Sequence, residues 1–123
     1  MGDEDRQIKY INVGMEFTTK VARKILENLE GDEQEEQMSV MKNIMLDYIK
    51  MENEYNISKR VLGKLKKGLE AENADMNKDV EAEYRAKLKE EMETSAASRD
   101  ELERDGRYQR LEAIISNQPS GKF

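Results

Sequence analysis

A regular apolar stripe runs from about Glu33 to Leu69, and no proline interrupts it. Its positions alternate steps of three and four residues, which is the heptad spacing of coiled coils. Eight of the nine positions are apolar, and we call them the predicted seam: Met41, Ile44, Tyr48, Met51, Tyr55, Ser58, Leu62, Leu65 and Leu69. The spacing predicts one continuous helix.

The length of this helix constrains the fold. At 1.5 Å per residue it would be roughly 55 Å long. A compact domain of 123 residues has a radius of gyration of only about 14 Å. We therefore expect an all-α, elongated antiparallel helical bundle or coiled coil of three to four helices. Part of the seam should then be available to a partner.

Composition supports a helical rod. Hydrophobic residues make up 37% of the chain and charged residues 39%, and such charge combined with heptad spacing is typical of coiled coils. Low hydrophobicity and high charge also mark disordered chains. Sustained heptads are not a property of disorder, so they favour the folded alternative.

The formal net charge of −6 argues against direct nucleic-acid binding. A local basic stretch, residues 59–67, lies near the end of the long helix. Cations there complement the helix dipole, which is the reading we favour over a contact with DNA phosphates.

The chain contains no Cys and no His. This excludes disulfides, zinc fingers, RING-type zinc sites and Cys or Ser–His nucleophiles built from these residues. No apolar run approaches 18 residues, and the acidic start fits neither a signal peptide nor N-myristoylation. We expect a soluble intracellular protein with no cofactor, no metal and no membrane span.

Other helices are predicted on either side of the long one. The first should cover about Asp3 to Glu30, with Gly31 in the left-handed conformation that ends a helix. Its apolar stripe is Ile8, Ile11, Met15, Thr18, Ala22, Ile25 and Leu29. The long helix should end near Gly68 or, alternatively, within 73–77.

The third helix is predicted from about Met76 to Thr94. Its apolar residues are spaced by four, so they wind around the helix, and we expect it to be half-buried at most. After a break at 94–98, Ser98 and Glu101 match a capping box. A last helix should then carry Leu102, Tyr108, Leu111 and Ile115. We divide the chain into a docking module, 1–116, and a flexible tail, 117–123.

One local pattern suggests metal binding. Residues 101–112 place oxygen-bearing side chains at some EF-hand positions. Glu101 stands where Asp is normal, Arg107 and Arg110 would crowd a cation, and the capping box favours a helix. No Gly-rich phosphate loop or dinucleotide motif occurs. We therefore predict no catalytic, cofactor-binding or metal-binding residues, and a solvated role for the carboxylates.

The seam contains aromatic and methionine side chains suited to a protein interface. Tyr48 and Tyr55 are seven residues apart, and Tyr is favoured in interfaces, although intramolecular packing is an alternative. Met adapts to irregular surfaces. We predict these partner-binding residues: Met41, Ile44, Tyr48, Met51, Tyr55, Leu62 and Leu65.

Three stretches resemble a known family. The run Leu46-Asp47-Tyr48-Ile49-Lys50-Met51-Glu52-Asn53-Glu54-Tyr55, followed by a break near Asn73 and by Asp79-Val80-Glu81-Ala82-Glu83-Tyr84, is similar to the N-terminal helical region of the non-SMC-element SUMO ligase. Glu103-Arg104-Asp105-Gly106-Arg107-Tyr108-Gln109-Arg110-Leu111 resembles the short helix before that family's zinc domain. The resemblance covers roughly 38–115.

This resemblance implies a module that docks onto the coiled-coil arm of the fifth SMC protein in the Smc five/six complex. That complex serves chromosome maintenance and DNA repair in the nucleus. The family's ligase activity belongs to a C-terminal SP-RING that needs Cys and His, which this sequence lacks, so we expect no enzyme activity here. Two tetrapeptides, at 49–52 and 88–91, match the short SUMO-acceptor pattern, which suggests sumoylation only weakly.

A second function class is also compatible with the sequence. A self-associating coiled-coil subunit of a cytoskeletal, kinetochore or trafficking assembly would show the same heptads. Homo-association without a partner would distinguish this alternative from a docking module.

Overall fold

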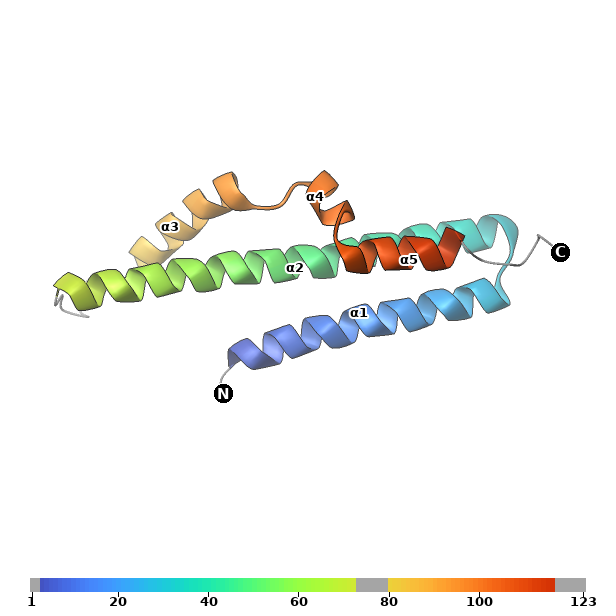
Figure 1. Ribbon diagram of the computed structural model, residues 1–123, viewed down its shortest axis with the longest axis horizontal. Helices are drawn as coiled ribbons and strands as arrows, with labels where there is room; N and C mark the ends of the chain where they lie inside the picture. Colours follow the sequence, from blue (N-terminus) through green and yellow to red (C-terminus); the bar gives the residue numbers. More distant parts are fainter. Residues whose placement is uncertain (1–2, 73–79, 117–123) are drawn as a thin grey trace. The chain divides into compact units, whose positions relative to one another are not determined.

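The computed structural model describes residues 3–72 and 80–116, and within these ranges the chain forms helices and no strand. Figure 1 shows the helices in chain order. They are α1 (Asp3–Asn28), α2 (Gly31–Glu72), α3 (Val80–Ser95), α4 (Arg99–Glu103) and α5 (Gly106–Ser116). The predicted all-α class is confirmed, and the fold is consistent with a helical bundle.

The chain divides into two compact units. Unit 1 consists of Met1–Met51 and Ser98–Phe123 and includes α1, the first part of α2, α4 and α5. Unit 2 is Glu52–Ala97, with the rest of α2 and α3. The predicted tail, 117–123, lies outside the described residues.

The inner face of α1 forms much of the core of unit 1. Ile11, Met15, Thr18 and Ala22 are buried, while Ile8, Ile25 and Leu29 of the predicted stripe are half-buried. The Thr18 hydroxyl donates to the carbonyl oxygen of Gly14 at 2.7 Å, so the one polar member of the face is satisfied. The stripe predicted from helical periodicity is thereby confirmed.

A tight link joins α1 to α2. Gly31 has a φ of 61°, the left-handed conformation expected of it. α1 ends at Asn28, slightly before the predicted Glu30. The Gln34 side chain donates from Nε2 to the carbonyl oxygen of Leu29 at 2.7 Å. A side chain of α2 therefore satisfies a carbonyl group that the end of α1 leaves without a helical partner.

The long helix α2 is continuous from Gly31 to Glu72. It passes through Gly68, so the prediction that the helix ends near that glycine is wrong. The alternative end, 73–77, lies outside the described residues. A single glycine costs only about 1 kcal/mol relative to Ala, which a long helix tolerates.

The buried positions of α2 differ from the alternating steps of the predicted seam. Leu46 is buried beside Met45, and the other buried positions from Met45 onward follow steps of four; this buried series is Met45, Ile49, Ile57, Val61 and Leu65. Half-buried Asn53 occupies the intervening step. Each step of four advances about 40° beyond one turn, so the buried series winds around the helix instead of following one heptad edge.

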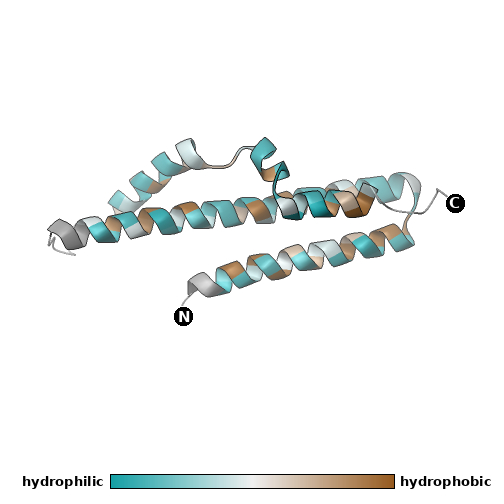
Figure 2. Cartoon of the chain, in the orientation of Figure 1, coloured by the Kyte–Doolittle hydropathy of each residue, from teal (hydrophilic) through white to brown (hydrophobic). Residues whose placement is uncertain are grey.

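In unit 2, α3 carries its apolar residues in steps of four. No residue of α3 is buried, and Val80, Tyr84, Leu88 and Met92 are half-buried, as predicted. In Figure 2, hydrophilic residues predominate along α3. The predicted start of this helix at Met76 lies outside the described residues.

Two polar contacts hold α3 and its following segment against α2. The hydroxyl groups of Ser58 and Tyr84 are 2.6 Å apart and form a hydrogen bond. The Asn53 side chain accepts a hydrogen bond at its Oδ1 from the backbone N–H of Ala97, at 3.0 Å. Asn53 thus interrupts the buried series of α2 with a side chain that has a specific partner.

The predicted last helix is divided in two, which corrects the predicted range of three to four helices. The capping box at its start is confirmed, because the Ser98 hydroxyl accepts from the Glu101 backbone N–H at 3.2 Å and Glu101 reaches back to the Ser98 N–H. α4 nevertheless ends at Glu103. Asp105 Oδ1 accepts from the Arg107 backbone N–H at 2.8 Å, so this aspartate caps a new helix, α5.

The short helices complete unit 1. Leu102 of α4 and Tyr108 and Leu111 of α5 are buried, as their spacing predicted. α5 packs against α1, and Lys42 of α2 lies 3.9 Å from Glu112 of α5. This ion pair is partly exposed and contributes little to stability.

Candidate partner-binding surfaces

The first part of the predicted seam lies in unit 1 and is incompletely covered. Met41, Ile44 and Tyr48 are half-buried, whereas Met51 is 47% exposed. The Tyr48 ring lies against α1, where a Cβ built on Gly14 would come within 2.6 Å of Tyr48 Oη. Tyr48 therefore has an intramolecular packing role, while Met51 presents an apolar side chain to solvent.

The second part of the predicted seam lies in unit 2. Tyr55 and Leu62 are half-buried, and Leu65 is buried at 5% exposure. Ser58, the one polar member, hydrogen-bonds Tyr84 of α3. The Leu69 side chain lies outside the described residues. Leu65 thus belongs to the core of unit 2, whereas Tyr55 and Leu62 retain accessible surface.

A second apolar surface lies on α1, and none of the sequence-based predictions included it. Tyr10, Val13 and Phe17 are 67%, 56% and 66% exposed, and half-buried Val21 continues the line. We call these four residues the outer α1 stripe. Their spacing of three, four and four residues was visible in the sequence. The buried stripe through Ile11 and Ala22 already explained why this segment forms an amphipathic helix, so the sequence offered no separate reason to predict a function for the outer α1 stripe.

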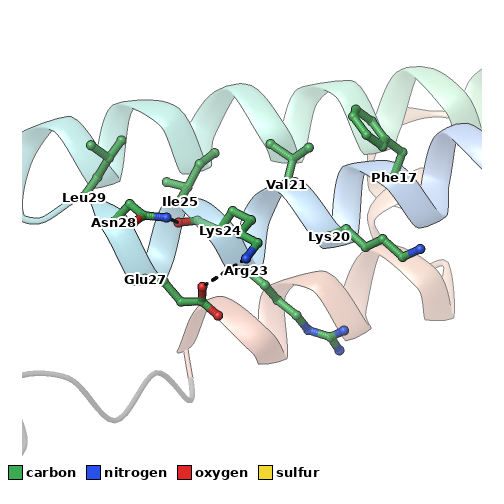
Figure 3. Close-up of a pocket in the computed structure, with 9 residues that line it drawn as sticks. All are labelled: Phe17, Lys20, Val21, Arg23, Lys24, Ile25, Glu27, Asn28 and Leu29. Carbon is green, nitrogen blue, oxygen red and sulfur yellow. Dashed lines mark hydrogen bonds and ion pairs between the residues drawn. The ribbon is translucent and has the colours of Figure 1, made fainter.

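The outer α1 stripe continues into an apolar groove. The groove has a volume of about 670 Å³ and is lined by α1 and the residue after it. Figure 3 shows its apolar side chains, Phe17, Val21, Ile25 and Leu29, projecting from the same side of the helix. Lys20 and Lys24 also line it. Phe17 and Val21 belong both to the stripe and to the groove.

Cations dominate the border of the outer α1 stripe. On a helix, the lateral neighbours of a residue are those three or four positions away. The charged residues at these distances from the stripe are Arg6, Lys9, Glu16, Lys20 and Lys24, which are four cations and one carboxylate. Lys24 also lies 3.7 Å from Glu27, in an exposed pair. This border is positive on a chain whose net charge is −6.

The basic stretch of α2 has a structural use in unit 2. Arg60 and Lys64 lie 3.4 Å and 3.7 Å from the Glu91 carboxylate of α3. The Ser95 hydroxyl donates to the same carboxylate at 3.2 Å. This hydrogen bond, followed by the charge of Lys64, lowers the pKa of Glu91 below its ordinary value. Two of the basic residues therefore join α2 to α3.

The stretch proposed to resemble a helix before a zinc domain spans a helix break. Asp105 receives the Arg107 guanidinium at 2.9 Å from Nε and 2.8 Å from Nη2. These hydrogen bonds lower the pKa of the Asp105 carboxyl. Asp105 is therefore the cap, and the helix starts at Gly106.

Within 3–72 and 80–116, no group of three or more acidic, His or Cys side chains could hold a metal ion. Over the same residues, none of the helices combines the length and the apolar character needed to cross a bilayer.

No protein-family model, curated protein or solved structure matches the chain. The resemblance to the SUMO ligase family therefore rests on the three sequence stretches alone.

Proposed function

We propose that this chain is a non-catalytic helical docking module that binds a coiled-coil partner through the predicted seam of α2. The observation that carries the proposal is the exposure of Met51, at 47%, in line with half-buried Ile44 and Tyr48. Covering an apolar side chain of this size by a partner contributes about 1.5–3 kcal/mol before the cost of ordering.

The family resemblance suggests which partner to test. It points to the coiled-coil arm of an SMC protein of the Smc five/six complex, and with it to a nuclear role in DNA repair and chromosome maintenance. Under this proposal the module positions a SUMO ligase without taking part in catalysis. Support comes from the seam and from the similarity at 46–55 and 103–111.

The sharpest variant is Met51→Asp, because Met51 is the most exposed predicted partner-binding residue whose burial is described. We expect it to weaken binding of the purified SMC arm by about tenfold or more, as measured by calorimetry, since a charge would replace an apolar side chain that the partner covers. Phe17→Asp, which introduces the same charge at an exposed site on α1, is the matched control and should bind normally.

Other outcomes would contradict the proposal. If the SMC arm does not bind the unmodified chain, the proposed partner is wrong. If the SMC arm binds Met51→Asp as well as it binds the unmodified chain, the proposed surface is wrong. A stable homodimer in sedimentation, lost in Met51→Asp, would instead support the self-associating structural subunit.

A further inference from the structure

We infer that the outer α1 stripe is a second docking surface and that its occupant is an acidic amphipathic helix of another protein. The stripe lies on α1, whereas the proposed function uses α2. The two proposals therefore rest on different residues and can fail separately.

The exposure of the stripe shows that the chain's own fold does not use it. Tyr10 and Phe17 are 67% and 66% exposed, while Ile11 and Ala22 on the inner face are 4% and 0% exposed. Each residue turns the helix by about 100°, which places the stripe roughly 125° from the centre of the buried face. α1 therefore has two apolar faces, and one of them remains open to solvent.

The width of the stripe fits a helix. Its anchors at positions i, i+3 and i+7 form the narrow line that pairs with another amphipathic helix. From Phe17 the groove continues in steps of four through Val21 to Ile25 and Leu29, so it winds from the outer α1 stripe toward the half-buried end of the inner face. A helix lying in a bilayer interface presents a broader apolar face than these single-file residues provide.

The charged border selects an acidic partner. Four cations and one carboxylate flank the stripe, so glutamates beside the apolar edge of the partner would meet lysines at most positions. Such complementarity speeds association and excludes basic partners. It also argues against a second copy of this chain. A symmetric pairing of two α1 stripes would bring the two positive borders together.

A displayed library of helical peptides tests the inference by offering many candidate partner helices at once. Each 28-residue peptide would carry apolar residues at its a and d positions, with Glu or Lys drawn equally at e and g. We expect peptides selected on the unmodified chain, and lost on Phe17→Asp, to be enriched in Glu. No Phe17-dependent enrichment, or enrichment in Lys, would overturn the inference.

Charge reversal provides a stricter check on the same library. In the double variant Lys9→Glu with Lys20→Glu, the selected peptides should shift from Glu to Lys at the flanking positions. Met51→Asp is the matched control and should still select the Phe17-dependent peptides, because Met51 lies on α2 and not on the outer α1 stripe. A selection unchanged by the double variant would overturn the assignment of an acidic occupant.

Two further measurements test other occupants of the outer α1 stripe. If the chain binds vesicles containing phosphatidylserine through Phe17, and no selected peptide competes, the occupant is a membrane and not a partner helix. If the chain forms a homodimer in sedimentation that Phe17→Asp dissociates, the occupant is a second copy of the chain. Helical circular dichroism of every variant should equal that of the unmodified chain, because the substituted side chains are exposed.

Discussion

Gly14 of α1 and Tyr48 of α2 lie so close together that a Cβ on the glycine would be 2.6 Å from Tyr48 Oη and closer still to the ring carbon Cζ. The glycine therefore has a packing role that outweighs its poor helix propensity. It also explains why Tyr48, a predicted partner-binding residue, is half-buried within its own chain.

Replacing this glycine should destabilise unit 1. We expect Gly14→Ala to lower the free energy of unfolding by about 1–3 kcal/mol, because the added methyl group overpacks the tyrosine ring. Urea unfolding followed by circular dichroism measures the change. Gly63→Ala is the matched control, since no atom lies within 4 Å of its Cβ position. It should stabilise α2 by about 0.5–1 kcal/mol. Equal effects of the two variants would contradict the proposed packing role.

Asp105 should make the stability of the α4–α5 junction dependent on pH. Asp105→Ala removes the cap and should cost about 1 kcal/mol near neutral pH. The Arg107 hydrogen bonds lower the pKa of Asp105 in the folded state. Its stabilisation is therefore present above the unfolded-state pKa, and it is lost as the pH falls through the folded-state pKa.

Urea unfolding across the acidic range, with Asp105→Asn as the control, checks this expectation. Asparagine can still accept the capping hydrogen bond but carries no charge. It should keep much of the stability at neutral pH and lose the pH-dependent part. An Asp105→Ala variant whose deficit stays constant down to acid pH would show that the charge of Asp105 is irrelevant.

The Glu91 carboxylate should titrate below its ordinary range, chiefly because of Ser95. We expect Ser95→Ala to raise the pKa of Glu91 more than Lys64→Ala does, since the hydrogen bond from Ser95 is the largest cause and the charge of Lys64 is the next. Carbon-detected NMR titration of the Glu91 carboxyl measures both shifts. A larger shift in Lys64→Ala would contradict this order.

The hydrogen bond from the Ala97 N–H to Asn53 should protect that amide from exchange. We expect Asn53→Ala to abolish the protection and to cost about 0.5–1.5 kcal/mol, the usual net value of such a bond. Amide hydrogen exchange at Ala97 reports it directly. Asn56→Ala, at an exposed position of the same helix, is the control. Protection that survives in Asn53→Ala would mean that another group holds the amide.

Much of the architecture was predictable because it depends on neighbours in the sequence. Helical periodicity located the inner face of α1 around Ile11 and Ala22, and the left-handed Gly31 marked the start of α2. The Ser98–Glu101 capping box fixed the beginning of α4. The break before α5 had a local signal too, in Asp105-Gly106. The apolar spacing across it suggested continuity and concealed the cap.

The candidate site was less predictable from the sequence. The predicted seam correctly indicated partly accessible apolar residues on α2, such as Ile44 and Tyr55. It did not distinguish exposed Met51 from buried Leu65. Their heptad positions look equivalent, and whether a side chain is covered depends on which helix lies over it.

The sequence by itself determined that this chain is helical, where the inner face of α1 lies, and which residues cap and link the helices. These features arise from backbone hydrogen bonding and side-chain spacing within a few turns. Only the tertiary structure decided that Met45, Ile49, Ile57, Val61 and Leu65 of α2 are buried in place of most of the predicted seam, and that Tyr10, Val13 and Phe17 remain exposed. Burial results from contacts between distant residues, such as Gly14 with Tyr48 and Asn53 with Ala97, and no local pattern specifies those pairings.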